Sequence, residues 1–136
     1  MLIILISLIL NLTQVSISID SILNPIITQP AFKYKDIKIL NHRVELTSTE
    51  ANHILLLSNT MKAYGKPTDN YILEGSTKVS TKDHGVYEIF NRLFNKKGIL
   101  KTRWHIESHG IDLYLVTNHK KITLYYVYTD SPTINK

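Results

Sequence analysis

Apolar and polar residues alternate through the last third of the chain. The alternation has a period of two in three runs, namely residues 100–108, 111–118 and 121–128. Such a period places the apolar side chains of a strand on one face. His109-Gly110 separates the first two runs, and polar residues 118–121 separate the last two. Because Gly adopts positive φ readily in a tight hairpin loop, the pattern predicts a three-stranded antiparallel meander.

A two-residue loop at His109-Gly110 also predicts which residues of the meander lie opposite one another. In the first hairpin, the expected pairs are Trp104 with Leu115, Ile106 with Leu113, and Ser108 with Ile111. In the second, they are Leu115 with Leu124, Leu113 with Tyr126, and Ile111 with Tyr128. The apolar partners then share one face, which we expect to be the core face.

An amphipathic helix is predicted upstream of the meander. Thr47 and Glu50 stand at capping-box spacing, and apolar residues follow at helical intervals from Ala51 to Met61. Gly65 is expected to end this helix, because Gly is favoured at the left-handed position that closes many helices.

A strand and a second helix are expected between the first helix and the meander. Residues 71–79 favour a strand in which Gly75 marks a bulge or bend. The second helix is predicted to begin near residues 80–83 and to end at Lys97, with Gly98 as its left-handed stop.

The first third of the chain is expected to be less regular. Pro25 and Pro30 indicate an extended path there. The predicted plan is a leader, an extended lead-in with short strands, an α+β domain and a tail, at residues 1–18, 19–46, 47–130 and 131–136. We expect a two-layer α+β fold, with two helices packed on an antiparallel sheet that ends in the three-stranded meander.

Residues 1–18 carry no charged side chain and start with an apolar run that ends near residue 12. A helix that spans a bilayer needs about 20 apolar residues, and this run is shorter. Ser16 and Ser18 place small residues where signal peptidase reads, although no Lys or Arg precedes the run. We expect a signal peptide cut near the Ser18–Ile19 bond, and a secreted or periplasmic protein. The alternative is an uncleaved membrane anchor with the domain outside the cytoplasm.

The amino-acid composition excludes several kinds of functional site. The chain has no Cys, which excludes disulfides, thiolate metal sites and Cys nucleophiles. The formal net charge of +5 suits nucleic acid, anionic lipid or an acidic partner, but no block of like charges marks a nucleic-acid-binding tail. The sequence shows no phosphate-binding glycine loop, H-E-x-x-H motif or nucleophile elbow. No cofactor is expected.

The polar side chains of the meander should lie together on the face opposite the core. The candidate functional residues on this face are Arg103, His105, Glu107, Asp112, Tyr114 and Tyr125. The register predicts Glu107 opposite Asp112 and His105 opposite Tyr114, and two facing carboxylates need a nearby cation such as Arg103. A solvated face is the simplest interpretation. A partner-binding face is an alternative, because Tyr and Arg often anchor protein interfaces, and a catalytic or metal site is another.

The spacing His105-x-Glu107-x-His109 would present three possible ligands on one side of a strand. His109 lies in the predicted turn, however, and no second ligand cluster supports a site. We therefore expect no bound metal.

One pattern resembles a known class of proteins. A helix ending in Y-G-K-P within residues 61–68 is followed by Trp104, then by Ile111-x-Leu113, and by I-x-L-x-Y in residues 122–126. This is similar to small exported α+β modules of the BamE-like and β-lactamase-inhibitor-like folds, over about residues 50–128. The resemblance implies binding of another protein and assigns no site residue. The order of elements is also compatible with an NTF2-like or cystatin-like fold.

We therefore expect an exported binding protein of the inhibitor, immunity or envelope-interaction type, and a non-enzymatic function is favoured. Its partner would be another protein held at the sheet face. The alternative is a small secreted nuclease, with Glu107 as base, His105 as acid and Arg103 on the phosphate. Apart from that alternative, nucleic acid is not an expected partner, and membrane contact is expected only through an uncleaved N-terminus.

Overall fold

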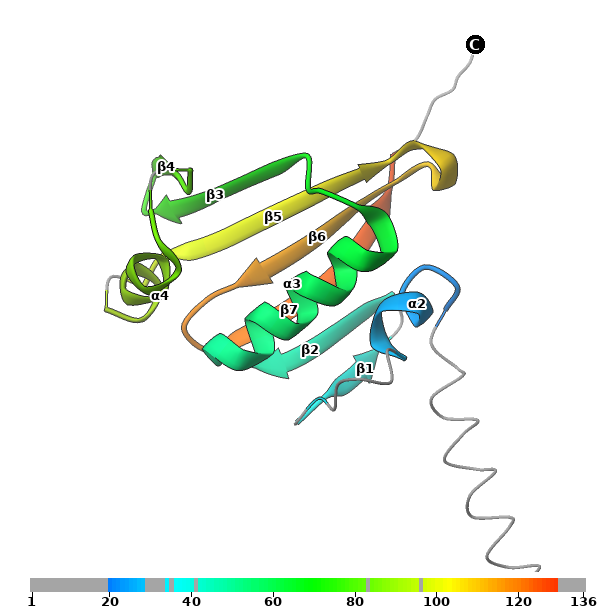
Figure 1. Ribbon diagram of the computed structural model, residues 1–136, viewed down its shortest axis with the longest axis horizontal. Helices are drawn as coiled ribbons and strands as arrows, with labels where there is room; N and C mark the ends of the chain where they lie inside the picture. The colour runs from blue at the N-terminus through cyan, green and yellow to red at the C-terminus, as the bar shows by residue number, and fades with distance from the viewer. Residues whose placement is uncertain are drawn as a thin grey trace, which may run out of the picture.

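The computed structural model describes residues 20–28, 34, 36–40, 42–82, 84–95 and 97–129. In this part of the chain, three α-helices and one antiparallel sheet of seven strands form an α+β fold (Figure 1). The elements are α2 (Asn24–Ile27), β1 (Lys38–Leu40), β2 (Arg43–Thr47), α3 (Glu50–Tyr64), β3 (Asp69–Glu74), β4 (Thr77–Ser80), α4 (Val86–Asn95), β5 (Ile99–Ile106), the 3₁₀ turn η1 (Glu107–His109), β6 (Ile111–Thr117) and β7 (Lys121–Tyr128). The strand order is β1-β2-β7-β6-β5-β3-β4.

The predicted meander is present as β5, β6 and β7. The second hairpin has the expected register, with Leu115 opposite Leu124 and Leu113 opposite Tyr126. The register expected for the first hairpin is wrong by two residues, because Trp104 lies opposite Leu113. The cause is the loop, in which η1 and Gly110, at φ +61°, replace the expected two-residue turn. A shift of two leaves the side chains of β5 and β6 on their predicted faces, whereas Glu107 and Ser108 lie in the loop.

The strand expected over residues 71–79 is instead a hairpin. Strand β3 ends at Glu74, which pairs with Thr77 of β4. Gly75, at φ +65°, lies in the two-residue loop between them. The glycine that suggested a bulge or bend therefore lies in the turn that reverses the chain.

Helix α3 begins and ends through local chain chemistry. Its N-cap is Thr49, whose hydroxyl accepts a hydrogen bond from the Asn52 amide at 3.0 Å. The predicted capping box from Thr47 to Glu50 is wrong, because Thr47 is the last residue of β2 and pairs with Lys121. Gly65, at φ +85°, ends the helix as expected.

Helix α4 is shorter than predicted, and the residue with positive φ after it is not the expected one. The left-handed residue after it is Lys97, at φ +56°, rather than Gly98. Gly98 is instead buried where the chain crosses β3, and a Cβ at this position would lie 3.1 Å from Ile72 Cγ2. A side chain here would require Ile72 to shift by a few tenths of an ångström, whereas the φ angle of Gly98 is not positive. Arg92 of α4 also binds both carboxylate oxygens of Glu74 of β3, at 2.9 and 3.0 Å.

The lead-in is structured where it is described. Asn24–Ile27 forms one helical turn, so the extended path expected there is wrong. Ile22, Leu23 and Ile26 are buried in the main core, and β2 pairs with β7 inside the sheet. The leader at residues 1–18 and the tail at 131–136 lie outside the described residues.

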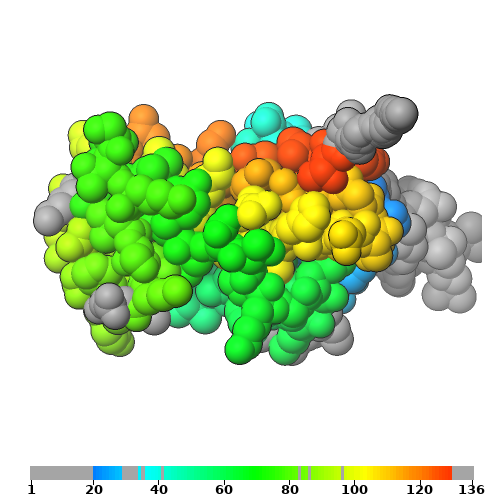
Figure 2. All heavy atoms as spheres, turned by 90° about the horizontal axis from the view of Figure 1, so that it is seen from above, coloured from blue at the N-terminus to red at the C-terminus, as the bar shows by residue number. Residues whose placement is uncertain are grey.

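All three helices pack on one face of the sheet. Helices α2 and α3 cover the main core beside Trp104 and Leu113. Phe90 and Leu93 of α4 cover Ile72 and Leu100, and Leu100 shares the core face of β5 with Trp104. Figure 2, seen from above the view of Figure 1, shows α3 on one side of the sheet and atoms of β6 (orange) on the other. The face opposite the three helices is called the outer face below.

Candidate functional site

The outer face carries a continuous row of large polar side chains. Cross-strand pairing joins residues of five neighbouring strands in one line: Arg43, Tyr125, Tyr114, Arg103 and Asp69. Because directly opposed side chains on one face are nearest neighbours, this line forms one surface. Three of the six predicted site residues lie in it.

Tyr114 and Tyr125 form a stacked pair at the centre of the row. Their ring centroids are 5.3 Å apart and the rings are inclined by 23°. Lys101 Nζ lies 4.9 Å from the centroid of Tyr114, and Lys78 Nζ lies 4.1 Å from the centroid of Tyr71 on β3. Burial raises the pKa of Tyr125, and the neighbouring Tyr114 and Tyr71 raise it further. The Tyr125 hydroxyl therefore stays protonated at neutral pH and can donate a hydrogen bond.

Arg103 links two carboxylates beside the tyrosine pair. Its Nη2 and Nε donate to Asp69 Oδ2 at 2.8 and 3.0 Å, and its Nη1 lies 3.4 Å from Asp112 Oδ1. The hydrogen bond to Asp69 raises the pKa of Arg103. Asp112 also lies 2.7 Å from His105 Nδ1. The structure thus brings together Arg103, His105 and Asp112, as the sequence indicated.

Glu107 does not belong to this group. It lies in η1, so the residue opposite Asp112 is His105 rather than Glu107, and the residue opposite Tyr114 is Arg103. The expected clash of two carboxylates is therefore wrong. For the same reason His105, Glu107 and His109 do not follow one strand, and among the residues that the structure describes no three His, Asp or Glu side chains could hold a metal ion.

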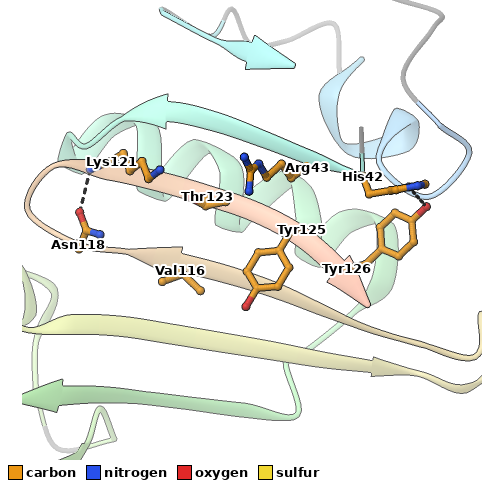
Figure 3. A pocket seen from close by; sticks show the side chains of 8 residues that line it. All are labelled: His42, Arg43, Val116, Asn118, Lys121, Thr123, Tyr125 and Tyr126. Carbon is orange, nitrogen blue, oxygen red and sulfur yellow. Dashed lines mark hydrogen bonds between the residues drawn. The ribbon is translucent and has the colours of Figure 1, made fainter. Parts of the chain in front are cut away.

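A hollow of about 440 Å³ adjoins the tyrosine pair, on the outer face over β2, β7 and β6 (Figure 3). It is lined by His42, Arg43, Val116, Asn118, Lys121, Thr123, Tyr125 and Tyr126. Arg43 Nε and Lys121 Nζ each lie 3.4 Å from the same oxygen, Glu45 Oε2. Sequence reasoning missed Arg43, Glu45 and Lys121, because nothing in the sequence predicted that β2 pairs with β7.

Tyr126, one of the residues that line the hollow, binds the start of the described chain. The Tyr126 hydroxyl donates to Asp20 Oδ2 at 3.0 Å and lies 2.7 Å from His42 Nδ1. The same carboxylate accepts hydrogen bonds from the amides of Ile22 and Leu23 through its other oxygen, both at 3.1 Å. Burial raises the pKa of Tyr126, and its hydrogen bonds raise it further. These contacts hold residues 20–28 against the sheet.

His53 of α3 is buried on the core side of the sheet. Its side chain is 4% exposed and its Nδ1 lies 2.6 Å from Thr117 Oγ1. Its ring also meets Phe90 of α4 edge-on, with centroids 5.3 Å apart. Burial lowers the pKa of His53 to about 4. This histidine is a structural group at the junction of α3, β6 and α4.

The chain matches no protein-family model, no curated protein and no solved structure. The resemblance to exported α+β modules therefore stays an expectation. Within the described ranges, no helix is both long enough and apolar enough to span a membrane.

Proposed function

We propose that this chain is an exported binding protein that holds another protein against the outer face, as an inhibitor, immunity protein or envelope interaction module does. The supporting observation is the row of tyrosine and arginine side chains on the face that the described helices leave uncovered. Export is proposed on the leader-like composition of residues 1–18.

The dimensions of the outer face suit such a contact. Strands lie about 4.8 Å apart and rise about 3.4 Å per residue, so the five central strands and their short neighbours present roughly 500–700 Å². A partner in a stable complex buries about 800 Å². Tyr and Arg contribute disproportionately to binding energy at the centre of such interfaces, and the Tyr114–Tyr125 pair has a central position here.

The proposal is tested by affinity capture from the native source, followed by binding to the purified captured protein. The variant is Tyr114→Thr/Tyr125→Thr, because Thr keeps a high β-propensity while removing both rings. We expect a loss of at least tenfold in affinity, since one interfacial hot spot alone contributes about 2 kcal/mol. Tyr87→Thr is the matched control, because Tyr87 lies on α4 and is 82% exposed. Equal binding by both variants would refute the proposal, provided that their melting temperatures agree.

A secreted nuclease is the second candidate, and one contact favours it. Asp112 holds His105 Nδ1 at 2.7 Å beside Arg103, an arrangement that would orient the imidazole as an acid or base. Glu107 lies in η1 and is no longer assigned the role of base. The His105 side chain is 43% exposed. Incubation with RNA, with and without chelator, tests it: cleavage that disappears in His105→Ala would favour the nuclease over the binding protein.

A further inference from the structure

The balance of donors and acceptors on the outer face indicates the chemistry of its partner. Among the described residues, this face presents six cations and three carboxylates, which the strand register assigns to it: Lys38, Arg43, Lys78, Lys101, Arg103 and Lys121, against Glu45, Asp69 and Asp112. The excess of positive charge would attract a negatively charged surface and increase the rate of encounter with it.

The three carboxylates are already engaged by neighbouring cations. Glu45 contacts Arg43 and Lys121, and both Asp69 and Asp112 contact Arg103. Lys78 and Lys101 lie over tyrosine rings instead, and within the described part of the chain neither has a carboxylate partner. The face therefore offers N–H and O–H donors, and its own acceptors are occupied.

The hollow is the point at which an incoming acceptor would find two cations at once. Arg43 and Lys121 come from adjacent strands and share one oxygen of Glu45 at 3.4 Å, which is long for a charged hydrogen bond. Their side chains are 52% and 54% exposed, so both can turn towards a ligand. Val116 and the Tyr125 ring supply apolar walls that would contact the methylene groups of an acidic side chain.

We propose that the partner is an acidic protein surface, and that the hollow receives one of its Asp or Glu side chains between Arg43 and Lys121. This rests on the proposed function and adds the charge of the partner and the place where it is recognised. The volume of about 440 Å³ is within the range of small ligand sites.

Single-stranded nucleic acid fits the same positive charge less well. Binding of a nucleobase needs an open aromatic face for stacking. The facing sides of Tyr114 and Tyr125 are stacked on each other, and Lys101 lies over the Tyr114 ring.

The test measures binding of a fluorescein-labelled octaglutamate peptide to the full chain by fluorescence polarisation at low salt. We expect Arg43→Gln/Lys121→Gln to weaken binding about tenfold, because each partly exposed charge contact contributes up to about 1 kcal/mol. Glu45→Gln should tighten binding about threefold, since it removes the carboxylate that competes for both cations. The matched control is Lys66→Gln/Lys97→Gln, which removes the same charge from exposed positions in the loops after α3 and α4 and should change the Kd less than twofold.

Three results separate the ways in which the inference could fail. Tighter binding of a twelve-residue oligothymidine than of octaglutamate would overturn the inference in favour of nucleic acid. Equal losses in the hollow variant and its control would also overturn it, because they would show attraction to net charge alone. If Tyr114→Thr/Tyr125→Thr still abolishes capture of the natural partner in that case, the proposed function stands and only the acidic recognition fails.

Discussion

Acid sensitivity of the fold at His53 follows directly from the structure. The imidazole is 4% exposed and its pKa is lowered to about 4 by burial, from an ordinary value of 6.5. The folded protein therefore keeps His53 neutral at a pH where the unfolded chain already binds a proton. Stability from this group is fully present above pH 6.5 and is lost as the pH falls towards 4. One pKa unit corresponds to 1.36 kcal/mol, so the loss at His53 amounts to about 3 kcal/mol.

The substitution His53→Gln tests this magnitude. Gln cannot titrate, but its side chain can still form a hydrogen bond with Thr117. Urea unfolding at pH 7, 6, 5 and 4 gives the free energy of unfolding of both proteins, and the difference between them isolates His53 from the carboxylates that titrate in the same range. We expect the wild type to lose about 3 kcal/mol more than the variant between pH 7 and 4.

A control separates burial from the mere loss of an imidazole. The matched control is His109→Gln, which makes the same substitution at an exposed imidazole in η1. A constant difference between wild type and His53→Gln across this pH range would refute the reasoning, because it would mean that His53 takes up its proton equally in the folded and unfolded states.

Three further predictions concern the local structure and the start of the chain. Thr49→Ala should lower the free energy of unfolding, measured with urea, by about 1 kcal/mol through loss of the helix cap, whereas Thr47→Ala should not remove the cap. A larger loss of stability in Thr47→Ala than in Thr49→Ala would instead favour the capping box predicted from the sequence. Gly98→Ala should cost about 1–3 kcal/mol in the same assay, because its methyl group would press on Ile72; an unchanged midpoint would contradict the close approach. Under the proposed export, mass spectrometry of the mature chain should find Ile19 as its first residue, and an intact leader would instead favour the membrane anchor.

Alternation along the strands was enough to predict the faces of the meander. Trp104 and Leu113 are buried and Tyr114 lies on the outer face, as the period of two requires. The loop of the first hairpin was not predicted, because Ser108 and His109 do not distinguish a two-residue turn from a turn of 3₁₀ helix. The register error of two residues left the side chains of β5 and β6 on their predicted faces. It changed the residue opposite Asp112 from the expected Glu107 to His105.

Contacts between distant segments could not be predicted from local patterns. The hollow exists because β2 pairs with β7, which are more than 70 residues apart, and the alternation of Arg43, Val44 and Glu45 indicates a strand without indicating its neighbour. The burial of His53 is similar, since a histidine on a helix becomes a core residue only once β6 and α4 enclose it. The sequence therefore predicted the tyrosine pair and the Arg103 group, but not the site beside them.

Site-specific crosslinking in the native source tests whether the outer face holds a protein partner. Tyr125 is replaced by the photoreactive phenylalanine derivative p-benzoylphenylalanine, with the same replacement at Tyr87 on α4 as the matched position. On illumination, we expect one protein adduct of defined mass from position 125 and none from position 87. Adducts from position 87 alone, or from neither position, would contradict it.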